Sequence, residues 1–392
     1  MHSLLAVVVS HGGSTHLHHL LSGLAAIRGC QVTLVENGPL AGPPVPAGVR
    51  VIEGQGNVGY GTAVNLAVRE AVESGTPAHW LLVVNSDVTI PDDTAEVLPK
   101  LLSWYPPSID VVGFPFLATP GGVAARSQAV LPTPRTSAFI ALRGETAALA
   151  RWPRLRYPVG AFFAVRMETF VRLGGFDPAF WMYYEETDLF ARLHAAGGRI
   201  AWADEEWPVV HVGGETVGRS GLLHAELGRA AALYARRHRL NVGWSWPAVH
   251  AGQLGLLTVR KLATGRPHDA LRAARILAGL AGGLARPAWE PAVRSRWRAV
   301  AAPAREGIGR LPARSLPVAF ASTGPRAEAG RPGAAGAETA ASRVAVPARP
   351  QPPFGAARSE AAWPAEAARS GSRAASTAGP DSPAGIGDTR SR

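Results

Sequence analysis

The sequence predicts an α/β fold built on a mostly parallel β-sheet flanked by helices. Short apolar segments alternate with segments of helical spacing over the first third of the chain, which is typical of such sheets. The predicted strands are residues 4–9, 31–36, 49–53, 80–84 and 110–114, and the predicted helices between them are residues 14–28, 62–73 and 92–103. Polar residues stand at or just beyond strand ends, where ligands bind in these sheets: Ser10, Glu36, Glu53 and Asp87.

Length and composition narrow the class of protein. The 392 residues are enough for two domains. A single cysteine, Cys30, excludes an internal disulfide and suits a reducing compartment. We expect no signal peptide, because the apolar segment 4–9 is short and lacks a basic flank. No apolar run approaches the roughly 20 residues of a membrane-spanning helix. These features predict a cytoplasmic protein.

The net charge is +11, and arginine supplies most of the cations. A basic excess suits nucleic acid, anionic lipid or phosphorylated substrates. The chain is also rich in alanine, glycine and proline, a bias typical of a GC-rich coding sequence, which raises arginine without a functional demand. We therefore expect no nucleic-acid partner.

Aromatic and acidic residues are concentrated in the segment 174–214. An aromatic patch, Phe180, Trp181, Tyr183 and Tyr184, leads directly into three acids, Glu185, Glu186 and Asp188. A helix is predicted at 189–196, ended by two glycines, and strands at 200–203 and 208–212, the second of which carries His211.

Two interpretations compete for these acids. Carboxylates in the first turn of a helix are favoured by its dipole, so capping explains one or two of them. Burial beside the aromatic patch would instead raise their pKa and make a proton acceptor that works near neutral pH. We favour the second interpretation for the set as a whole.

Two further segments follow predicted strands. Residues 57–65 read NVGYGTAVN and match neither the dinucleotide fingerprint nor the P-loop pattern. A tight turn would explain the glycines, but backbone amides at the start of the next helix also suit a diphosphate. Asn85-Ser86-Asp87 follows an apolar strand, where Asp87 is either a cap or a hard oxygen ligand for Mg²⁺ or Mn²⁺.

Together these segments resemble the family 2 glycosyltransferases, inverting enzymes with the GT-A fold, and more narrowly their bacterial rhamnosyltransferase-like branch. The segments are GGFDPAFWMYYEETDL, NVGYGTAVN, NSD, VGAFFAVR at 159–166, and the strand with His211 followed by Gly214, Thr216 and Gly218. They occur in the family's order and cover roughly residues 4–240. The resemblance implies a GT-A-type nucleotide-binding sheet, followed here by a helical C-terminal region and a disordered tail.

The resemblance also implies roles for individual residues. It gives the catalytic base to Glu186, where the family usually has Asp, with Glu185 and Asp188 beside it. It implies a divalent cation, Mg²⁺ or Mn²⁺, on Asp87 and His211, although a histidine in a strand is more often a core residue. Asn85 replaces the first Asp of the commoner metal motif. The substrate-binding candidates are Ser10, His11, Glu36, Asn37, Asn57, Gly59, Gly61, Asn65, Asn85, Gly160 and Trp181.

The implied reaction is a single in-line displacement on a nucleotide-diphosphate sugar. The branch suggests rhamnose as the sugar and a cell-envelope glycan or polyprenyl-linked acceptor, which would place the protein at the inner face of the plasma membrane. Two other classes stay open. A sugar nucleotidyltransferase shares the nucleotide-binding half, and a non-catalytic nucleotide- or glycan-binding protein could keep the fold without the base.

We divide the chain into a glycosyltransferase domain at 1–240, a basic helical region at 241–315 and a disordered tail at 316–392, poor in large apolar residues. Residues 118–157 are predicted to be loops. In the helical region, Trp244, Trp246, Trp289 and Trp297 flank basic helices within 254–285. This pattern suits either a membrane surface or a packed subdomain with a solvated basic face.

Overall fold

A computed structural model describes residues 4–12, 15–40, 42–75, 78–211 and 221–311. All of them lie within one compact unit, Met1–Thr323. The predicted disordered tail lies outside the described residues, as do Gly214, Thr216 and Gly218 of the histidine motif.

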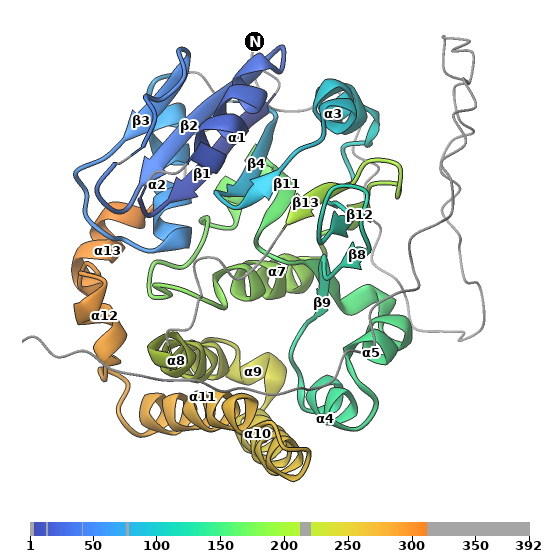
Figure 1. Ribbon diagram of the computed structural model, residues 1–392, viewed down its shortest axis with the longest axis vertical. Coiled ribbons are helices and arrows are strands. Elements are labelled where there is room, and N and C mark those ends of the chain that lie inside the picture. The colour runs from blue at the N-terminus through green and yellow to red at the C-terminus, as the bar shows by residue number, and fades with distance from the viewer. Residues whose placement is uncertain (1–3, 13–14, 41, 76–77, 212–220, 312–392) are drawn as a thin grey trace, which may run out of the picture. The chain divides into compact units, whose positions relative to one another are not determined.

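A seven-stranded sheet forms the centre of this unit (Figure 1), with strand order β12-β6-β11-β4-β1-β2-β3. Its strands are β1 Leu4–Ser10, β2 Cys30–Glu36, β3 Val49–Ile52, β4 Trp80–Asn85, β6 Val111–Gly113, β11 Phe162–Arg166 and β12 Ile200–Trp202. Only β11 runs antiparallel to its neighbours β4 and β6. The predicted mostly parallel α/β sheet is therefore confirmed.

The strand β1 shows why the sheet lies in the middle of the molecule. All seven of its residues are buried. Leu5, Val7 and Val9 face one apolar core, while the alternate residues Leu4, Ala6 and Val8 face another. A strand that is apolar on both faces must be covered on both sides, as parallel sheets are.

Helices cover both faces. The first core contains apolar residues of α2 Tyr60–Glu73, α6 Met167–Arg172 and α7 Glu185–Ala195. The second contains residues of α1 Thr15–Ala26 and α3 Asp92–Trp104. The predicted helices therefore form close to their expected bounds, and α7 begins four residues earlier than expected, at the acids themselves.

A second sheet brings His211 to the metal motif. It contains β5 Val88–Thr89, β13 Val209–His211, β7 Phe116–Leu117 and β8 Ala124–Ala125. In its register His211 pairs with Val88, the residue after Asp87. The backbone pairing thus holds the two predicted metal ligands side by side.

The prediction of loops over residues 118–157 was wrong. The segment contains α4 Pro134–Arg143, α5 Glu145–Arg151 and the 3₁₀ turn η1 Pro153–Leu155, and a small sheet of β9 Gln128–Val130 and β10 Arg156–Pro158. Thr133 caps α4 and forms a reciprocal capping box with Thr136, with Pro134 at the first helical position. The same proline and threonines that suggested loops are the start signals of this helix.

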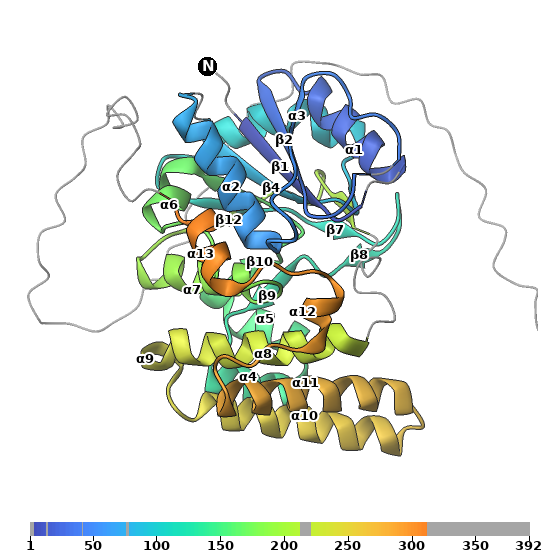
Figure 2. The same ribbon diagram turned by 90° about the vertical axis from the view of Figure 1, so that its left-hand side faces the viewer.

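Helices follow β13 to the end of the described residues: α8 Gly221–Arg237, α9 Arg239–Val242, α10 Trp246–Ala263, α11 Pro267–Ala285, α12 Ala292–Arg296 and α13 Ala302–Gly309. Figure 2 shows α8, α11 and α10 stacked in layers. Gly228 of α8 and Gly279 of α11 let these helices touch, because a Cβ on Gly228 would lie 1.9 Å from the Ile276 carbonyl oxygen.

The four tryptophans of this region do not share one environment. Trp246 is buried and donates a hydrogen bond to Ser137 of α4, and Trp289 and Trp297 are half-buried. Only Trp244 is strongly exposed, at 79%. No helix among the described residues combines the length and apolar character needed to cross a bilayer.

Candidate active site

A cavity of about 290 Å³ opens where β1 and β4 end and the turn before β11 begins. The structure brings to it most of the site residues expected from the sequence: Ser10, His11, Asn37, Asn57, Gly59, Asn85, Asp87, Gly160, Glu185, Glu186 and His211. It also brings residues that were not predicted as site residues: Tyr60, Ser86, Val159, Met182, Tyr183 and Trp297. Glu36, Gly61, Asn65, Trp181 and Asp188 do not line it.

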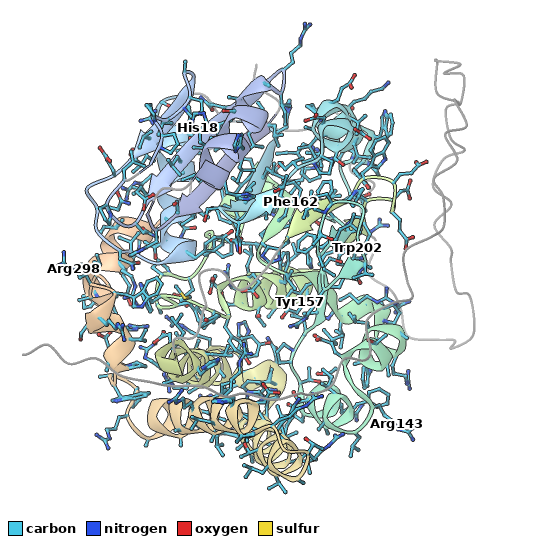
Figure 3. The ribbon with its side chains drawn as sticks, viewed as in Figure 1. His18, Arg143, Tyr157, Phe162, Trp202 and Arg298 are labelled. Carbon is cyan, nitrogen blue, oxygen red and sulfur yellow. The ribbon has the colours of Figure 1, made fainter. Side chains whose placement is uncertain are left out.

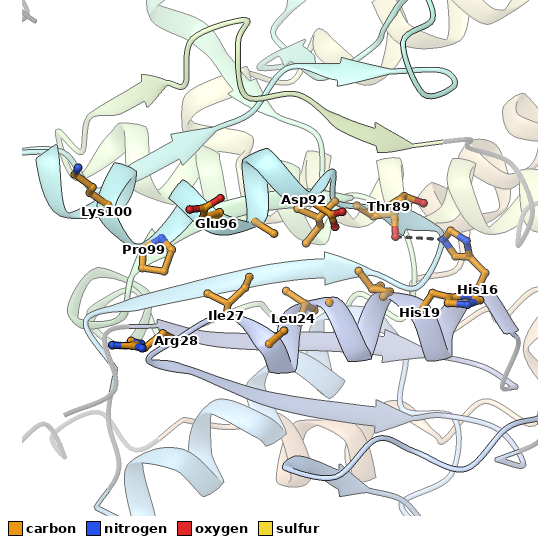
Figure 4. A pocket seen from close by; sticks show the side chains of 16 residues that line it. His16, His19, Leu24, Ile27, Arg28, Thr89, Asp92, Glu96, Pro99 and Lys100 are labelled. Carbon is orange, nitrogen blue, oxygen red and sulfur yellow. Dashed lines mark hydrogen bonds between the residues drawn. The ribbon is translucent and has the colours of Figure 1, made fainter. Parts of the chain in front are cut away.

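A larger cavity, of about 1040 Å³, lies between α1 and α3 (Figure 4). Apolar side chains such as Leu24 and Ile27 line it, and charged residues such as Lys100 stand among them. Its histidine His16 contacts the Val88 carbonyl oxygen at 3.2 Å. It contains none of the three acids of α7, so we place the candidate active site in the smaller cavity.

Asp87 and His211 form one wall of the smaller cavity. His211 Nε2 lies 3.4 Å from Asp87 Oδ1, and that buried oxygen accepts no hydrogen bond. Burial alone would raise the pKa of Asp87, but the contact with His211 outweighs it, and the pKa lies below its ordinary value. Asp87 is therefore ionised at neutral pH.

This pair fits a small divalent cation. Two ligands of one Mg²⁺, each about 2.1 Å from it, lie about 3 Å apart, close to the separation of these atoms. Among the residues that the structure describes, no group of three or more His, Cys, Asp or Glu side chains is placed to hold a metal. The pair thus offers two ligands, which suits a cation completed by substrate phosphate oxygens and water.

Glu185 and Glu186, at the start of α7, line the same cavity. Tyr183 and Tyr184 just before them have positive φ angles, 68° and 66°, which are costly for large side chains. Tyr184 caps the helix with its backbone, so Glu185 and Glu186 occupy its first turn. Such strain is found where a fold must hold particular groups in place.

Burial changes the protonation of both glutamates. Glu185 is only 6% exposed, and its Oε2 has no hydrogen-bond partner. Burial and the charge of Glu186 raise the pKa of Glu185 well above its ordinary value. Glu186 is half-buried, and burial also raises its pKa. A glutamate of raised pKa that keeps part of its surface on a cavity suits a general base.

Gly160 and Tyr60 lie beside Glu186. A Cβ on Gly160 would lie 3.5 Å from Glu186 Cγ, so the missing side chain leaves room next to the carboxyl group. The Tyr60 hydroxyl donates to the Gly160 carbonyl oxygen at 2.9 Å. Burial and the charges of Glu185, Asp87 and Glu186 raise the pKa of Tyr60. Tyr60 thus carries a neutral hydroxyl close to Asp87, Glu185 and Glu186. In the sequence, only its place in the NVGYG segment pointed to this position.

The loop at 57–59 is clamped to the aromatic patch. Gly59 has a φ of 82°, and a Cβ there would lie 2.0 Å from the Trp181 carbonyl oxygen, so only glycine fits. Trp181 Nε1 donates to Asn57 Oδ1 at 3.1 Å, and Tyr60 N donates to the Trp181 carbonyl oxygen at 3.2 Å. Trp181 and Asn57 therefore hold the loop against the acid-bearing segment.

Glu36 does not line the cavity but binds the backbone that follows β1 and β2. Its Oε1 accepts from the backbone amides of Gly12 and Gly38 at 2.7 and 2.8 Å, while Oε2 is buried without a partner. The Ser10 hydroxyl donates to the Gly12 carbonyl oxygen at 3.1 Å. Asn37 donates to the Gly59 carbonyl oxygen, and its own Oδ1 is buried without a hydrogen-bond partner.

Gly61 and Asn65 of α2 lie behind the site. A Cβ on Gly61 would lie 2.7 Å from Phe176 Cβ. Asn65 is fully buried and donates to the carbonyl oxygens of Phe176 and Gly309, at 2.7 and 2.8 Å. These residues join α2 to Phe176, which precedes the acids of α7, and to Gly309 of α13.

Asp188 faces away from the cavity into a buried network. Its Oδ1 lies 2.8 Å from His238 Nε2, and its Oδ2 accepts from Arg192 at 2.7 Å. Arg192 in turn donates to the carbonyl oxygens of Leu173 and Gly175. Burial would raise the pKa of Asp188, but His238 and Arg192 outweigh it and lower the pKa. The network ties α7 to α8 and to the Gly174-Gly175 turn.

We expect Asp188→Ala to destabilise the fold by about 3 kcal/mol at pH 7, because it leaves Arg192 and His238 without their buried partner. Chemical denaturation measures this. Since the folded-state pKa of Asp188 is lowered, its stabilisation is present above pH 3.8 and disappears as the pH falls through the folded-state value. Asp269→Ala is the control, because its partner Lys261 lies 3.3 Å away at the surface. Equal stability of the two variants would contradict the network.

Comparison with known proteins decides the family. The chain is 30% identical over 256 residues to the N-acetylglucosaminyl-diphospho-decaprenol L-rhamnosyltransferase of two Mycobacterium tuberculosis strains, CDC 1551 / Oshkosh and ATCC 25618 / H37Rv. The match covers 56% of this chain and 80% of each relative. The chain belongs to the rhamnosyltransferase-like family 2 glycosyltransferases. This glycosyltransferase matches none of the protein-family models.

Solved glycosyltransferases resemble the chain more weakly. TarS of S. aureus is 14% identical, with a TM-score of 0.37 over 70% of this chain and 54% of its own. Glucosyl-3-phosphoglycerate synthase from Mycobacterium tuberculosis is 15% identical, with a TM-score of 0.39 over 60% of this chain and 79% of its own. Structural similarities this weak support no inference about the fold or the function of this glycosyltransferase. Its GT-A-type fold instead follows from its family and from the sheet described above.

Proposed function

We propose that this glycosyltransferase moves a sugar, with inversion, from a nucleotide-diphosphate sugar to a polyprenyl-linked acceptor of the cell envelope. One observation carries the proposal. Two carboxyl groups of raised pKa, the buried Glu185 and the half-buried Glu186, line the same cavity as Asp87 and His211. A general base and a site for a divalent cation on one cavity are the two groups that a displacement at a sugar diphosphate needs.

Glu186 acts as the base in this mechanism. It takes the proton from the acceptor hydroxyl while that oxygen forms a bond to the anomeric carbon, and the bond from that carbon to the diphosphate oxygen breaks on the opposite side. Gly160 leaves room beside the Glu186 carboxyl group for the incoming hydroxyl. Glu185 is buried more deeply, and burial and the Glu186 charge raise its pKa, which favours its neutral form over a second charge beside Glu186.

Asp87 and His211 would hold the divalent cation, Mg²⁺ or Mn²⁺. When bound, it neutralises charge on the leaving diphosphate. Asn85 and Ser86 line the cavity beside them and supply neutral polar groups. Because the chain contributes one carboxylate here, we expect the nucleotide and the cation to bind together.

The substrates are inferred from the relatives. Their name describes transfer of L-rhamnose to a decaprenol-linked N-acetylglucosamine diphosphate. We infer a deoxythymidine-diphosphate rhamnose donor and an acceptor of the same chemical class. A sugar nucleotidyltransferase would release pyrophosphate, and a non-catalytic binding protein would bind nucleotide without turnover.

A donor screen tests this function. The purified full chain is incubated with Mn²⁺ and a panel of nucleotide sugars, and nucleoside diphosphate and pyrophosphate are measured separately. We expect nucleoside diphosphate release that requires an acceptor and is fastest with the deoxythymidine-diphosphate rhamnose donor. Pyrophosphate release, or nucleotide binding without turnover, would support the other two classes instead.

An exposed face of α10 and α11 suits the lipid that such an acceptor requires. Several large apolar side chains are exposed to solvent there: Leu256, Leu257, Val259, Leu262 and Leu271. Exposed cations lie among them: Arg260, Arg266, Arg272 and Arg275. The other sides of both helices pack on the protein, through buried residues such as Leu254 and Ala273, as a packed subdomain would. We propose that the exposed face contacts anionic lipid at the inner face of the plasma membrane.

We expect the full chain to bind anionic vesicles and the double variant Val259→Asp/Leu262→Asp to bind them at least tenfold more weakly. Two lost apolar contacts and two added negative charges each oppose binding. Vesicle co-sedimentation measures this, and added salt should weaken the wild-type interaction. Val123→Asp, at a site that is 77% exposed and outside these helices, is the control. Equal binding by all three proteins, or equal binding to neutral vesicles, would refute the lipid contact.

A further inference from the structure

The segment 286–311, which we call the C-terminal strap, returns from the end of α11 to the nucleotide-binding half. It contains α12 and α13, and it runs beside α8 and α2 (Figures 1 and 2). Gly309 lies close enough to α2 that a Cβ would meet Thr62 and Pro178 at 2.9 Å. The strap thus reaches the elements that carry the site motifs.

Asn57 fastens the strap to the cavity. The Asn57 side chain donates to the Trp297 carbonyl oxygen at 3.0 Å, and the Val300 amide donates to the Asn57 carbonyl oxygen at 2.8 Å. The same side chain accepts from Trp181. Asn57 therefore joins the loop at 57–59, the aromatic patch and the C-terminal strap.

Two buried arginines hold the strap in place. Arg305 is fully buried and donates to the carbonyl oxygens of Pro178, Ala179 and Val300. Arg294 is 2% exposed and pairs with Glu226 of α8 at 2.8 Å. A buried cation is tolerated only when its donors are satisfied, so these bonds make the strap part of the folded unit.

Trp297 extends from this strap into the cavity wall. It is half-buried, and its ring centroid lies 4.9 Å from that of His11, at an interplanar angle of 46°. The next residue, Arg298, has a φ of 50° and lies exposed on the outer side of the strap (Figure 3). The sharp backbone turn separates the two side chains. Because the rings of His11 and Trp297 already touch, they form a joint aromatic wall.

The order of the strands indicates whether the nucleoside or the sugar of a nucleotide-diphosphate sugar would lie against His11 and Trp297. Asp87 follows β4, and His11 follows β1 on the side of β4 that leads to β2. Gly160, next to Glu186, precedes β11 on the opposite side of β4. A diphosphate at Asp87 with its sugar toward Glu186 must therefore extend its nucleoside toward His11, Asn37 and Trp297.

We propose that Trp297, together with His11, forms the surface on which the base of the nucleoside diphosphate stacks. The proposal rests on the proposed function, because it assumes a nucleotide donor in this cavity. An indole presents a large π face, and stacking on it tolerates different bases.

The test compares nucleotides with and without a base. Calorimetry gives the Kd of deoxythymidine diphosphate, uridine diphosphate and inorganic pyrophosphate for the full chain in Mn²⁺. Trp297→Leu keeps apolar volume without an aromatic face. We expect it to raise the Kd of both nucleotides by about 5- to 150-fold and to leave that of pyrophosphate unchanged. Trp297→Phe should retain most of the nucleotide affinity.

His11→Ala, in an exposed loop, is a second variant that leaves the strap contacts intact and should also weaken only the nucleotides. Trp104→Leu, on an exposed tryptophan of α3, should change neither Kd. Wild-type nucleotide affinity in Trp297→Leu would overturn the stacking role while the proposed function stands. An equal rise in the Kd of pyrophosphate for this variant would also overturn it, because it would indicate a general loss of structure. A wild-type chain that binds no nucleotide would overturn both proposals.

Discussion

Glu186→Gln is expected to reduce sugar transfer by about 10²- to 10⁴-fold at saturating donor, the usual contribution of a general base. The amide has nearly the same shape as the carboxyl group but cannot take the acceptor proton. Donor affinity, measured by calorimetry, should stay near the wild-type value, because the base acts only in the chemical step. Glu186→Asp should keep appreciable activity, since it restores the residue usual in the family.

The pH profile gives an independent check on the same residue. Burial raises the pKa of Glu186 above its ordinary 4.5, so the wild-type rate should fall on acidification with a midpoint above that value. Glu185→Gln is the matched control, because Glu185 lies deeper and accepts no proton in the proposed step. If Glu185→Gln loses the rate and Glu186→Gln does not, the role belongs to Glu185. If neither does, this cavity does not contain the base.

Asp87→Asn is expected to weaken donor binding and turnover together, with turnover reduced about 10²-fold or more. The variant removes the ionised oxygen beside His211 and with it several kcal/mol of charge stabilisation at the leaving diphosphate. Donor calorimetry with and without Mn²⁺ measures the coupling. The wild type should bind donor more tightly with the cation, and the variant should show little difference.

His211→Ala should cost less than Asp87→Asn, because the imidazole brings no negative charge. The two changes together should be non-additive, since both act on one bound cation. Ser86→Ala, at the residue that precedes Asp87 and lines the same cavity, is the control for local packing. Unchanged, Mn²⁺-dependent activity in Asp87→Asn would exclude Asp87 as a metal ligand.

The sequence predicted the parts of the site that depend on local pattern. Strand ends follow from apolar runs that stop at polar residues, so Ser10, Glu36, Glu53 and Asp87 were expected at one edge of the sheet. The structure places Ser10 and Asp87 on one cavity, which Glu36 and Glu53 do not line. The acids of α7 were expected as a cluster. The split between Glu186 on the cavity and Asp188 in a buried network depends on His238, which is 50 residues further along the chain.

The parts that the sequence did not predict depend on distant contacts. Trp297 and Asn57 are 240 residues apart, and no periodicity connects them, so Trp297 was grouped with residues flanking basic helices. The helix α4 was missed for a different reason. Its Pro and Thr start signals are the same residue types that mark loops, and only the reciprocal bonds of Thr133 and Thr136 distinguish the two.

The most direct test of the account is one reaction of the full chain with nucleotide sugar, Mn²⁺ and a polyprenyl-diphosphate-linked N-acetylglucosamine acceptor. Nucleoside diphosphate and glycosylated acceptor are quantified together, and NMR gives the anomeric configuration of the new bond. We predict equal amounts of the two products and a configuration opposite to that of the donor. Retained configuration, pyrophosphate as the product, or no transfer by a chain that binds the nucleotide would contradict inverting transfer in this cavity.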